Sequence, residues 1–256
     1  MADRAFVLDL PVDLLPMEGA VARVADVLAG PRAAPGTPLH IVTMNAEMAM
    51  QAQRDAELGD IIRAAGLVVP DGSGVVWAVR RQMPQKGLEK VAGVDLVREL
   101  VSAGAASGWR FYLLGGQPGV AQAAAEALAA VHPGFHLAGV RDGFFAAAEE
   151  PDVLAGIRAA APDVLLVALG VPRQEKWIRQ HLGAIGVPVA MGVGGSFDVF
   201  AGRVRRAPAA FRRLHLEWLF RLLQEPWRIQ RMRSTLPAFV REVLTRPPGA
   251  TSEVRS

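Results

Sequence analysis

Residues 67–80 read LVVPDGSGVVWAVR and place a single carboxylate between two apolar runs. Asp71 follows Leu67–Pro70 and precedes Gly72, so it lies on a tight turn at which a buried strand would pass into a helix. A carboxylate held at such a turn can act as a general base. It can equally form the turn and cap the helix, without any chemistry. The local sequence leaves both interpretations open.

Four other segments follow apolar runs in the same way and are rich in glycine or polar residues. They are TMNAE (43–47), GGQPGVA (115–121), GVPRQEKWI (170–178) and GVGGSFDVFAG (192–202). Glycine lets the backbone approach a ligand closely. Because the carboxyl ends of parallel strands converge on one crevice, these segments predict a single binding site.

Each candidate binding residue in these segments also has an ordinary structural explanation. Thr43 and Asn45 can hold a sugar or a base, or they can cap a helix. Gly115 and Gly116 precede a helix start that suits phosphate, although the spacing is not GxGxxG and the turn can be a simple one.

The later segments are equally open. Gln174 and Glu175 can bind a ligand, or they can be ordinary residues of a helix start. Asp198 can bind or cap, and Gly194 lies in the same glycine-rich loop.

The elements that must position these residues alternate along the chain. The predicted strands are Ala5–Leu8, His40–Thr43, Leu67–Val69, Arg110–Leu114, Phe135–Val140, Val164–Ala168 and Val187–Met191. Helical patterns cover 17–29, 45–65, 72–82, 94–106, 118–131, 149–160 and 173–182. Repeated strand–helix units with continuous apolar strands predict an α/β, Rossmann-like, doubly wound and mainly parallel sheet with helices on both faces.

Charge divides the chain into parts. Residues 203–246 hold eleven arginines and three glutamates, a net charge of +8 within a chain whose formal charge is +3. We therefore expect a catalytic core over 1–202, an Arg-rich helical appendage over 203–246 and a disordered tail over 247–256. A basic helical segment calls for an anionic partner such as a diphosphate, an anionic lipid surface or nucleic acid.

Composition excludes several kinds of site. The chain has no cysteine, so disulfides, thiolate metal sites and cysteine nucleophiles are excluded. No HExxH sequence and no Asp-x-Asp occurs, so we expect no metal and no other cofactor. Neither a signal peptide nor a bilayer-spanning stretch is apparent, which predicts a cytoplasmic protein or one attached to the inner face of the cell membrane.

Taken in order, the segments resemble a known family. TMNAE, PDGSGVV, VAGVDLVREL, FYLLGGQPGVAQAAAEAL, GVRDGFF, PDVLLVALGVPRQEKWI, GVGGSFDVFAGRVRRAP and LEWLFRLLQEPWRIQR are similar to the WecG/TagA/CpsF family of bacterial glycosyltransferases. The resemblance runs from about residue 5 to residue 235. It implies a metal-independent, inverting transfer of a sugar, typically N-acetylmannosamine, from a UDP-sugar. The implied acceptor is an undecaprenyl-diphosphate-linked sugar of teichoic acid, antigen, capsule or exopolysaccharide synthesis.

The resemblance also implies roles for individual residues. Asp71 would be the general base, Thr43 and Asn45 would line its pocket, and Gln174 would contact substrate. Arg221, Arg228 and Arg231 would meet the donor diphosphate, with the appendage closed over the site. Lys90 stands where the family usually has arginine, which keeps the charge but loses the bidentate fork.

Alternatives remain at this point. Relatives transfer N-acetylmannosaminuronic acid or glucose, and they can self-associate. A nicotinamide-dependent oxidoreductase would need a ribose-binding acid that we do not find. A nucleic-acid-binding module would need a recognition helix or an aromatic sheet face. The arginines lie beside Trp218, Phe220 and Trp227, which favours anionic lipid over nucleic acid.

Overall fold

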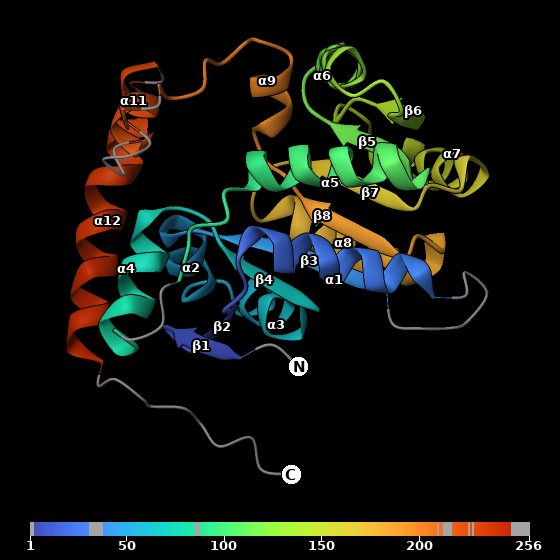
Figure 1. The fold of residues 1–256 in the computed structure, drawn as a ribbon. Coiled ribbons are helices and arrows are strands. Elements are labelled where there is room, and N and C mark those ends of the chain that lie inside the picture. The colour runs from blue at the N-terminus through green and yellow to red at the C-terminus, as the bar shows by residue number, and fades with distance from the viewer. Residues whose placement is uncertain are drawn as a thin grey trace.

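The structure is a computed structural model that describes residues 3–30, 38–84, 88–208, 210–211, 217–224, 226 and 228–246. A six-stranded sheet in the order β4-β3-β8-β7-β5-β6 forms its centre (Figure 1). Every neighbouring pair of strands in it is parallel. The strands are β3 (Leu39–Met44), β4 (Leu67–Pro70), β5 (Arg110–Gly115), β6 (His136–Arg141), β7 (Val164–Ala168) and β8 (Val189–Gly192).

Helices cover both faces of this sheet. The helices of the described part of the chain are α1 (Met17–Ala29), α2 (Ala46–Ala52), α3 (Ala56–Ala64), α4 (Ser73–Gln82), α5 (Gly93–Ser107), α6 (Val120–Val131), α7 (Glu150–Ala160), α8 (Arg173–Ile185), α9 (Ser196–Phe200), α11 (Glu217–Gln224) and α12 (Arg228–Thr245). One face packs against α1, α5, α6 and α9. The other packs against α7 and α8 over one half, and against α2, α3 and α4 over the other.

The strand sequences explain this double cover. In β5, Phe111 and Leu113 face one helical layer, and Tyr112 and Leu114 face the other. All four are buried, so β5 lacks the polar alternation of a half-exposed strand. The predicted doubly wound, parallel α/β fold is confirmed.

The first predicted strand lies elsewhere. β1 (Arg4–Val7) pairs antiparallel with β2 (Leu10–Asp13) in a separate two-stranded sheet, so its expected place among the parallel strands is wrong. Leu8 and Asp9 form the two-residue turn with φ of 53° and 63°, the backbone that a tight hairpin requires. The missing Gly or Asn made this turn hard to see in the sequence.

The predicted helical pattern over 45–65 is two helices, not one. Asp55 separates them as the N-cap residue of α3, because its carboxylate accepts a hydrogen bond from the Leu58 N–H at 3.1 Å.

The C-terminal helix α12 lies against α2 and α4 (Figure 1). Phe239 and Val243 are buried in the same apolar cluster as the hairpin, α2, α3 and α4. The division at residue 203 stays a prediction, but α12 contributes to the core cluster. Of the described helices, none combines the length and the apolar character needed to cross a membrane.

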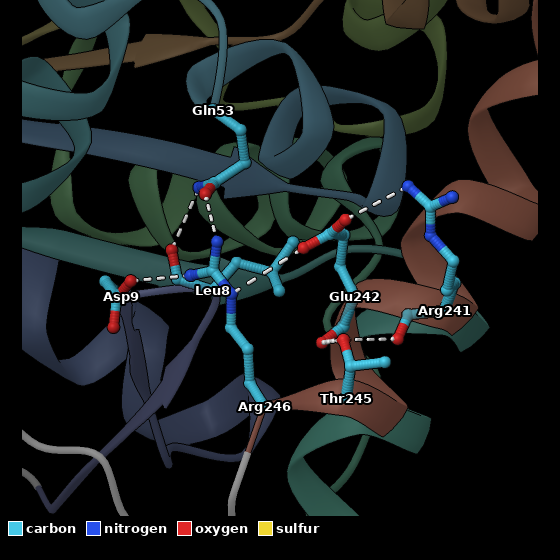
Figure 2. A network of polar contacts seen from close by, with 7 residues as sticks. All are labelled: Leu8, Asp9, Gln53, Arg241, Glu242, Thr245 and Arg246. Atoms are coloured by element: carbon cyan, nitrogen blue, oxygen red, sulfur yellow. Dashed lines mark hydrogen bonds and ion pairs between the residues drawn. The ribbon is translucent and has the colours of Figure 1, made fainter.

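A polar network fastens the end of α12 to the hairpin (Figure 2). Arg246 donates to Asp9 Oδ2 at 2.6 Å and to Gln53 Oε1 at 2.9 Å, and Gln53 Nε2 donates to the Leu8 carbonyl oxygen at 3.0 Å. Arg246 therefore joins three segments that are far apart in the sequence: the turn of the hairpin, the end of α2 and the end of α12.

Replacing Phe239 by alanine should lower the free energy of unfolding by about 3 kcal/mol, because a large buried ring leaves a cavity beside α2 and α4. Urea denaturation measures the change. Val240→Ala is the matched control, since Val240 lies next to Phe239 on α12 and is 41% exposed. Equal losses in the two variants would contradict the packing of α12 on the core.

Candidate active site

A pocket of about 700 Å³ opens at the carboxyl ends of β5, β6, β7 and β8. That volume is in the range of small-molecule and cofactor sites. Its lining residues are Gly116, Gln117, Gly143, Phe144, Phe145, Ala146, Ala168, Leu169, Gly170, Arg173, Gly194, Gly195 and Asp198. The glycines expose backbone amides, and Arg173 and the phenylalanines add a cation and flat apolar rings.

The order of the strands explains why the pocket forms here. β5 and β7 are neighbours, but β5 connects through α6 to β6 on one side, and β7 connects through α8 to β8 on the other. The loops leave in opposite directions, so a crevice remains between them, as in other doubly wound sheets.

The two glycines at the end of β5, Gly115 and Gly116, have different structural roles. A Cβ at Gly115 would lie 2.4 Å from the Ala168 carbonyl oxygen, and Gly115 has a φ of 122°. Gly115 is therefore required by the close approach of β5 and β7. Gly116 lines the pocket, together with Gly194 and Asp198 from the loop after β8. Three of the predicted binding residues thus come together in the pocket.

Asp71 does not line this pocket. It lies at the carboxyl end of β4, at the same edge of the sheet, in a corner formed with Thr43 and the start of α5. A Cβ at Gly93 would lie 3.5 Å from Asp71 Oδ2 and 3.2 Å from Thr43 Cγ2. The start of α5 thus faces both side chains, and α5 has no side-chain cap there. The partial positive charge of a helix start stabilises negative charge in this corner.

Thr43 joins this corner to the pocket. Its hydroxyl donates to the Gly192 carbonyl oxygen at 3.4 Å, and Gly194, two residues further on, lines the pocket. Asn45 caps α2, because its Oδ1 accepts from the Met48 N–H at 2.9 Å. The cap uses only the oxygen of the side chain, so the amide NH₂ of Asn45 can still donate to a ligand.

Lys90 borders the same corner, since the neighbouring Val91 N–H donates to the Pro70 carbonyl oxygen, next to Asp71. The Lys90 ammonium forms an ion pair with Glu217 at the start of α11, and Arg206 forms one with Asp95 in the first turn of α5. Two ion pairs thus attach the segment after α9 to the rim of the crevice. An anionic ligand of Lys90 would therefore compete with the Glu217 carboxylate for the ammonium group.

Gln174 and Glu175 lie beneath the pocket rather than on its surface. Gln174 is 1% exposed and Glu175 is fully buried. Gln174 Nε2 donates to Glu175 Oε1 at 2.7 Å, and Gln174 Oε1 accepts from the Gly194 N–H at 3.0 Å. Burial raises the pKa of the Glu175 carboxyl to about 7, although the hydrogen bond from Gln174 acts in the opposite direction.

The predicted diphosphate ligands Arg221, Arg228 and Arg231 lie on α11 and α12. Their side chains fall outside the described part of the chain, so their predicted role stays a prediction. Among the residues that the structure describes, no group of three His, Asp or Glu side chains could hold a metal ion.

Phe144, Phe145 and Arg173 are among the pocket residues that the sequence did not single out. Arg173 lies over the Phe145 ring, with 5.4 Å from its guanidinium carbon to the ring centroid, and Phe144 is 63% exposed. The signal was present, because GVRDGFF also follows a strand end. Its strand β6 is an exposed edge strand, which made the loop look peripheral.

Comparisons with known proteins bear on the family of the chain. The family model described as "Glycosyl transferase WecG/TagA/CpsF family" matches residues 5–251. An N-acetylglucosaminyldiphosphoundecaprenol N-acetyl-beta-D-mannosaminyltransferase of Bacillus subtilis (strain 168) is 36% identical over 204 residues. This alignment covers 80% of the present chain and 78% of the relative.

The raised pKa of Glu175 should make stability depend on pH. The unfolded chain releases this proton near pH 4.5 and the folded chain near 7, so stability falls as pH rises through that range. Glu175→Gln removes the titration. The stability gained by this variant over wild type should therefore grow between pH 5 and pH 8, up to about 3 kcal/mol.

Urea denaturation of both proteins at several pH values measures this difference. Glu126→Gln is the control, because Glu126 is an exposed carboxylate on α6 that accepts a hydrogen bond from Gln122. A difference between wild type and Glu175→Gln that stays constant from pH 5 to pH 8 would contradict the buried, proton-binding carboxyl.

Proposed function

The chain belongs to the WecG/TagA/CpsF glycosyltransferase family, and we propose on that premise that it transfers N-acetylmannosamine from its UDP-sugar to N-acetylglucosaminyl-diphosphoundecaprenol. The acceptor and the transferred sugar are those named for the Bacillus subtilis relative. Membership also sets aside the oxidoreductase and the nucleic-acid-binding module. The product would be a lipid-linked disaccharide for a cell-surface polysaccharide.

The reaction is a single in-line displacement. A hydroxyl oxygen of the acceptor sugar attacks C1 of the donor sugar, and the bond between C1 and the β-phosphate oxygen breaks with both electrons leaving on UDP. The acceptor proton passes to a base, and the configuration at C1 inverts. The protein must therefore supply one base on the acceptor side and positive charge around the leaving diphosphate.

The position of Asp71 carries this proposal. Its carboxylate lies beside Thr43 and the start of α5, in the corner of the crevice that adjoins the pocket. We assign Asp71 as the base. The Asp71 side chain is half-buried, and the backbone N–H of Asp71 donates to the Met44 carbonyl oxygen at 2.8 Å, which fixes the backbone that carries the carboxylate.

The larger pocket suits the nucleotide end of the donor. The exposed Phe144 ring offers a face for a base, Asp198 an acceptor for ribose hydroxyls, and the amides near Gly116 and Gly194 donors for phosphate. The diphosphate would then extend toward the start of α5 and Lys90. Arg221, Arg228 and Arg231 would complete its neutralisation without a metal.

The lipid-linked acceptor calls for a membrane surface, and the C-terminal helices offer one. Trp218, Leu223, Ile229 and Leu244 are exposed apolar residues of α11 and α12. The segment also carries the Arg excess noted above, which suits anionic lipid. We propose that these helices rest on the inner face of the cell membrane. Self-association stays a prediction.

A screen of UDP-sugars against the lipid-linked acceptor tests the reaction. UDP-N-acetylmannosamine should be the preferred donor, and EDTA should leave the rate unchanged because arginines replace the metal. Acceptor in anionic vesicles should react faster than acceptor in neutral ones. Preference for UDP-glucose or UDP-N-acetylmannosaminuronic acid would reassign the donor, and loss of activity in EDTA with recovery in Mn²⁺ would refute the metal-free mechanism.

Replacing Asp71 by asparagine should lower turnover by roughly 10²-fold or more, because the amide cannot accept the proton. UDP affinity and melting temperature should stay close to wild type, since size and hydrogen-bonding shape are kept. Initial rates and UDP titration measure these effects.

Asp60→Asn is the matched control, because the Asp60 side chain is 79% exposed on α3 and pairs with Arg63. It should retain full turnover. Normal turnover in Asp71→Asn would return Asp71 to the role of a turn residue.

A further inference from the structure

Glu175 is a buried carboxyl without an evident reason in the mechanism above. It is 0% exposed, and its Oε2 has no hydrogen-bond partner within the described residues. A buried carboxyl with one oxygen that has no hydrogen-bond partner lowers the stability of the fold. An apolar side chain of similar size would lower it less at this position. Its presence calls for a role beyond packing.

The surroundings of Glu175 indicate what that role is. Gln174 Nε2 donates to Glu175 Oε1 at 2.7 Å. This bond fixes the orientation of the Gln174 amide, with its NH₂ group toward Glu175. The opposite end, Gln174 Oε1, accepts from the Gly194 N–H at 3.0 Å. A free amide could turn over and present NH₂ to Gly194, which would put two donors face to face.

The backbone at Gly192 packs closely against the side chains of Gln174 and Glu175. A Cβ at Gly192 would lie 2.6 Å from Gln174 Nε2 and 2.7 Å from Glu175 Oε1. The two side chains therefore touch the backbone of the loop over residues 192–195 directly. Gly194 and Gly195 of that loop line the pocket, and Gly194 has a φ of 50°.

We infer that Glu175 is a positioning residue. It orients the Gln174 amide, the amide holds the Gly194 N–H, and this chain of contacts sets the shape of the loop over 192–195 that borders the nucleotide pocket. Glu175 acts through Gln174 and does not touch substrate. The nucleotide part of this inference rests on the proposed function, whereas the effect on Gly194 does not.

The test uses Glu175→Met and Glu175→Gln. Methionine has similar size but no strong acceptor, whereas the glutamine carbonyl oxygen can still accept from Gln174. Glu175→Met should speed hydrogen exchange of the Gly194 amide, followed by NMR of glycine-labelled protein, and weaken UDP binding, each by ~10-fold. Glu175→Gln should restore both. Melting temperature should not fall in Glu175→Met, which separates positioning from general support of the fold.

A double-variant cycle with Gln174→Met tests the order of the contacts. Because Glu175 acts through Gln174, the Gly194 amide of the double variant should exchange no faster than that of Gln174→Met alone. The double variant should also bind UDP as tightly as Gln174→Met. Additive losses would overturn the inference, as would an unchanged Gly194 exchange rate in Glu175→Met.

If Glu175→Met does not fold, Gln174→Met decides by itself. It removes only the amide and should speed Gly194 exchange to the same extent, and a normal exchange rate in that folded variant would overturn the inference. If the wild-type protein binds no UDP, the proposed function fails, and the exchange measurements still decide whether Glu175 positions the loop.

Discussion

Burial of a parallel sheet on both faces is the constraint on which the rest of this structure depends. Strands such as β5 and β7 are buried over nearly their whole length, so their side chains are mainly apolar, and most polar and charged side chains lie near the strand ends or in the loops. The carboxyl ends collect the loops of β3, β4, β5, β6, β7 and β8 at one edge. The candidate active site is a consequence of this topology, because that edge is where chemistry-bearing residues can gather.

Close backbone approach then shapes the site. Gly115 lets β5 pass against Ala168, and Gly192 leaves room for Gln174 and Glu175 beneath the end of β8. The site therefore has two layers. An upper layer of Thr43, Asp71 and glycine amides faces the crevice. A buried layer of amide and carboxyl holds the loops of the upper layer in place.

The C-terminal segment is attached to the core at two separate places. Apolar burial of Phe239 and the Arg246 network fix α12 against α2 and the hairpin. Nearer the candidate site, Lys90 pairs with Glu217, the first residue of α11, and Arg206 pairs with Asp95 in the first turn of α5. The first attachment combines apolar burial with a polar network, whereas the second consists of ion pairs that an anionic ligand can compete for.

The sequence by itself determined the fold class, six of the seven predicted strands as members of one parallel sheet, and the edge at which the site lies. These follow from local signals, because apolar runs, turn glycines and capping residues act over a few positions. It also singled out Gly116, Gly194 and Asp198, which line the pocket, and Asp71 and Thr43, which lie together at the same edge of the sheet. Only the tertiary structure decided that Ala5–Leu8 leaves the sheet for a hairpin, and that Gln174 and Glu175 lie below the pocket. Likewise, only the structure brought Phe144 and Arg173 to the pocket and paired Lys90 with Glu217. Each of these depends on contacts between residues distant in the chain, and no local pattern of residue types specifies which distant segment will supply the partner.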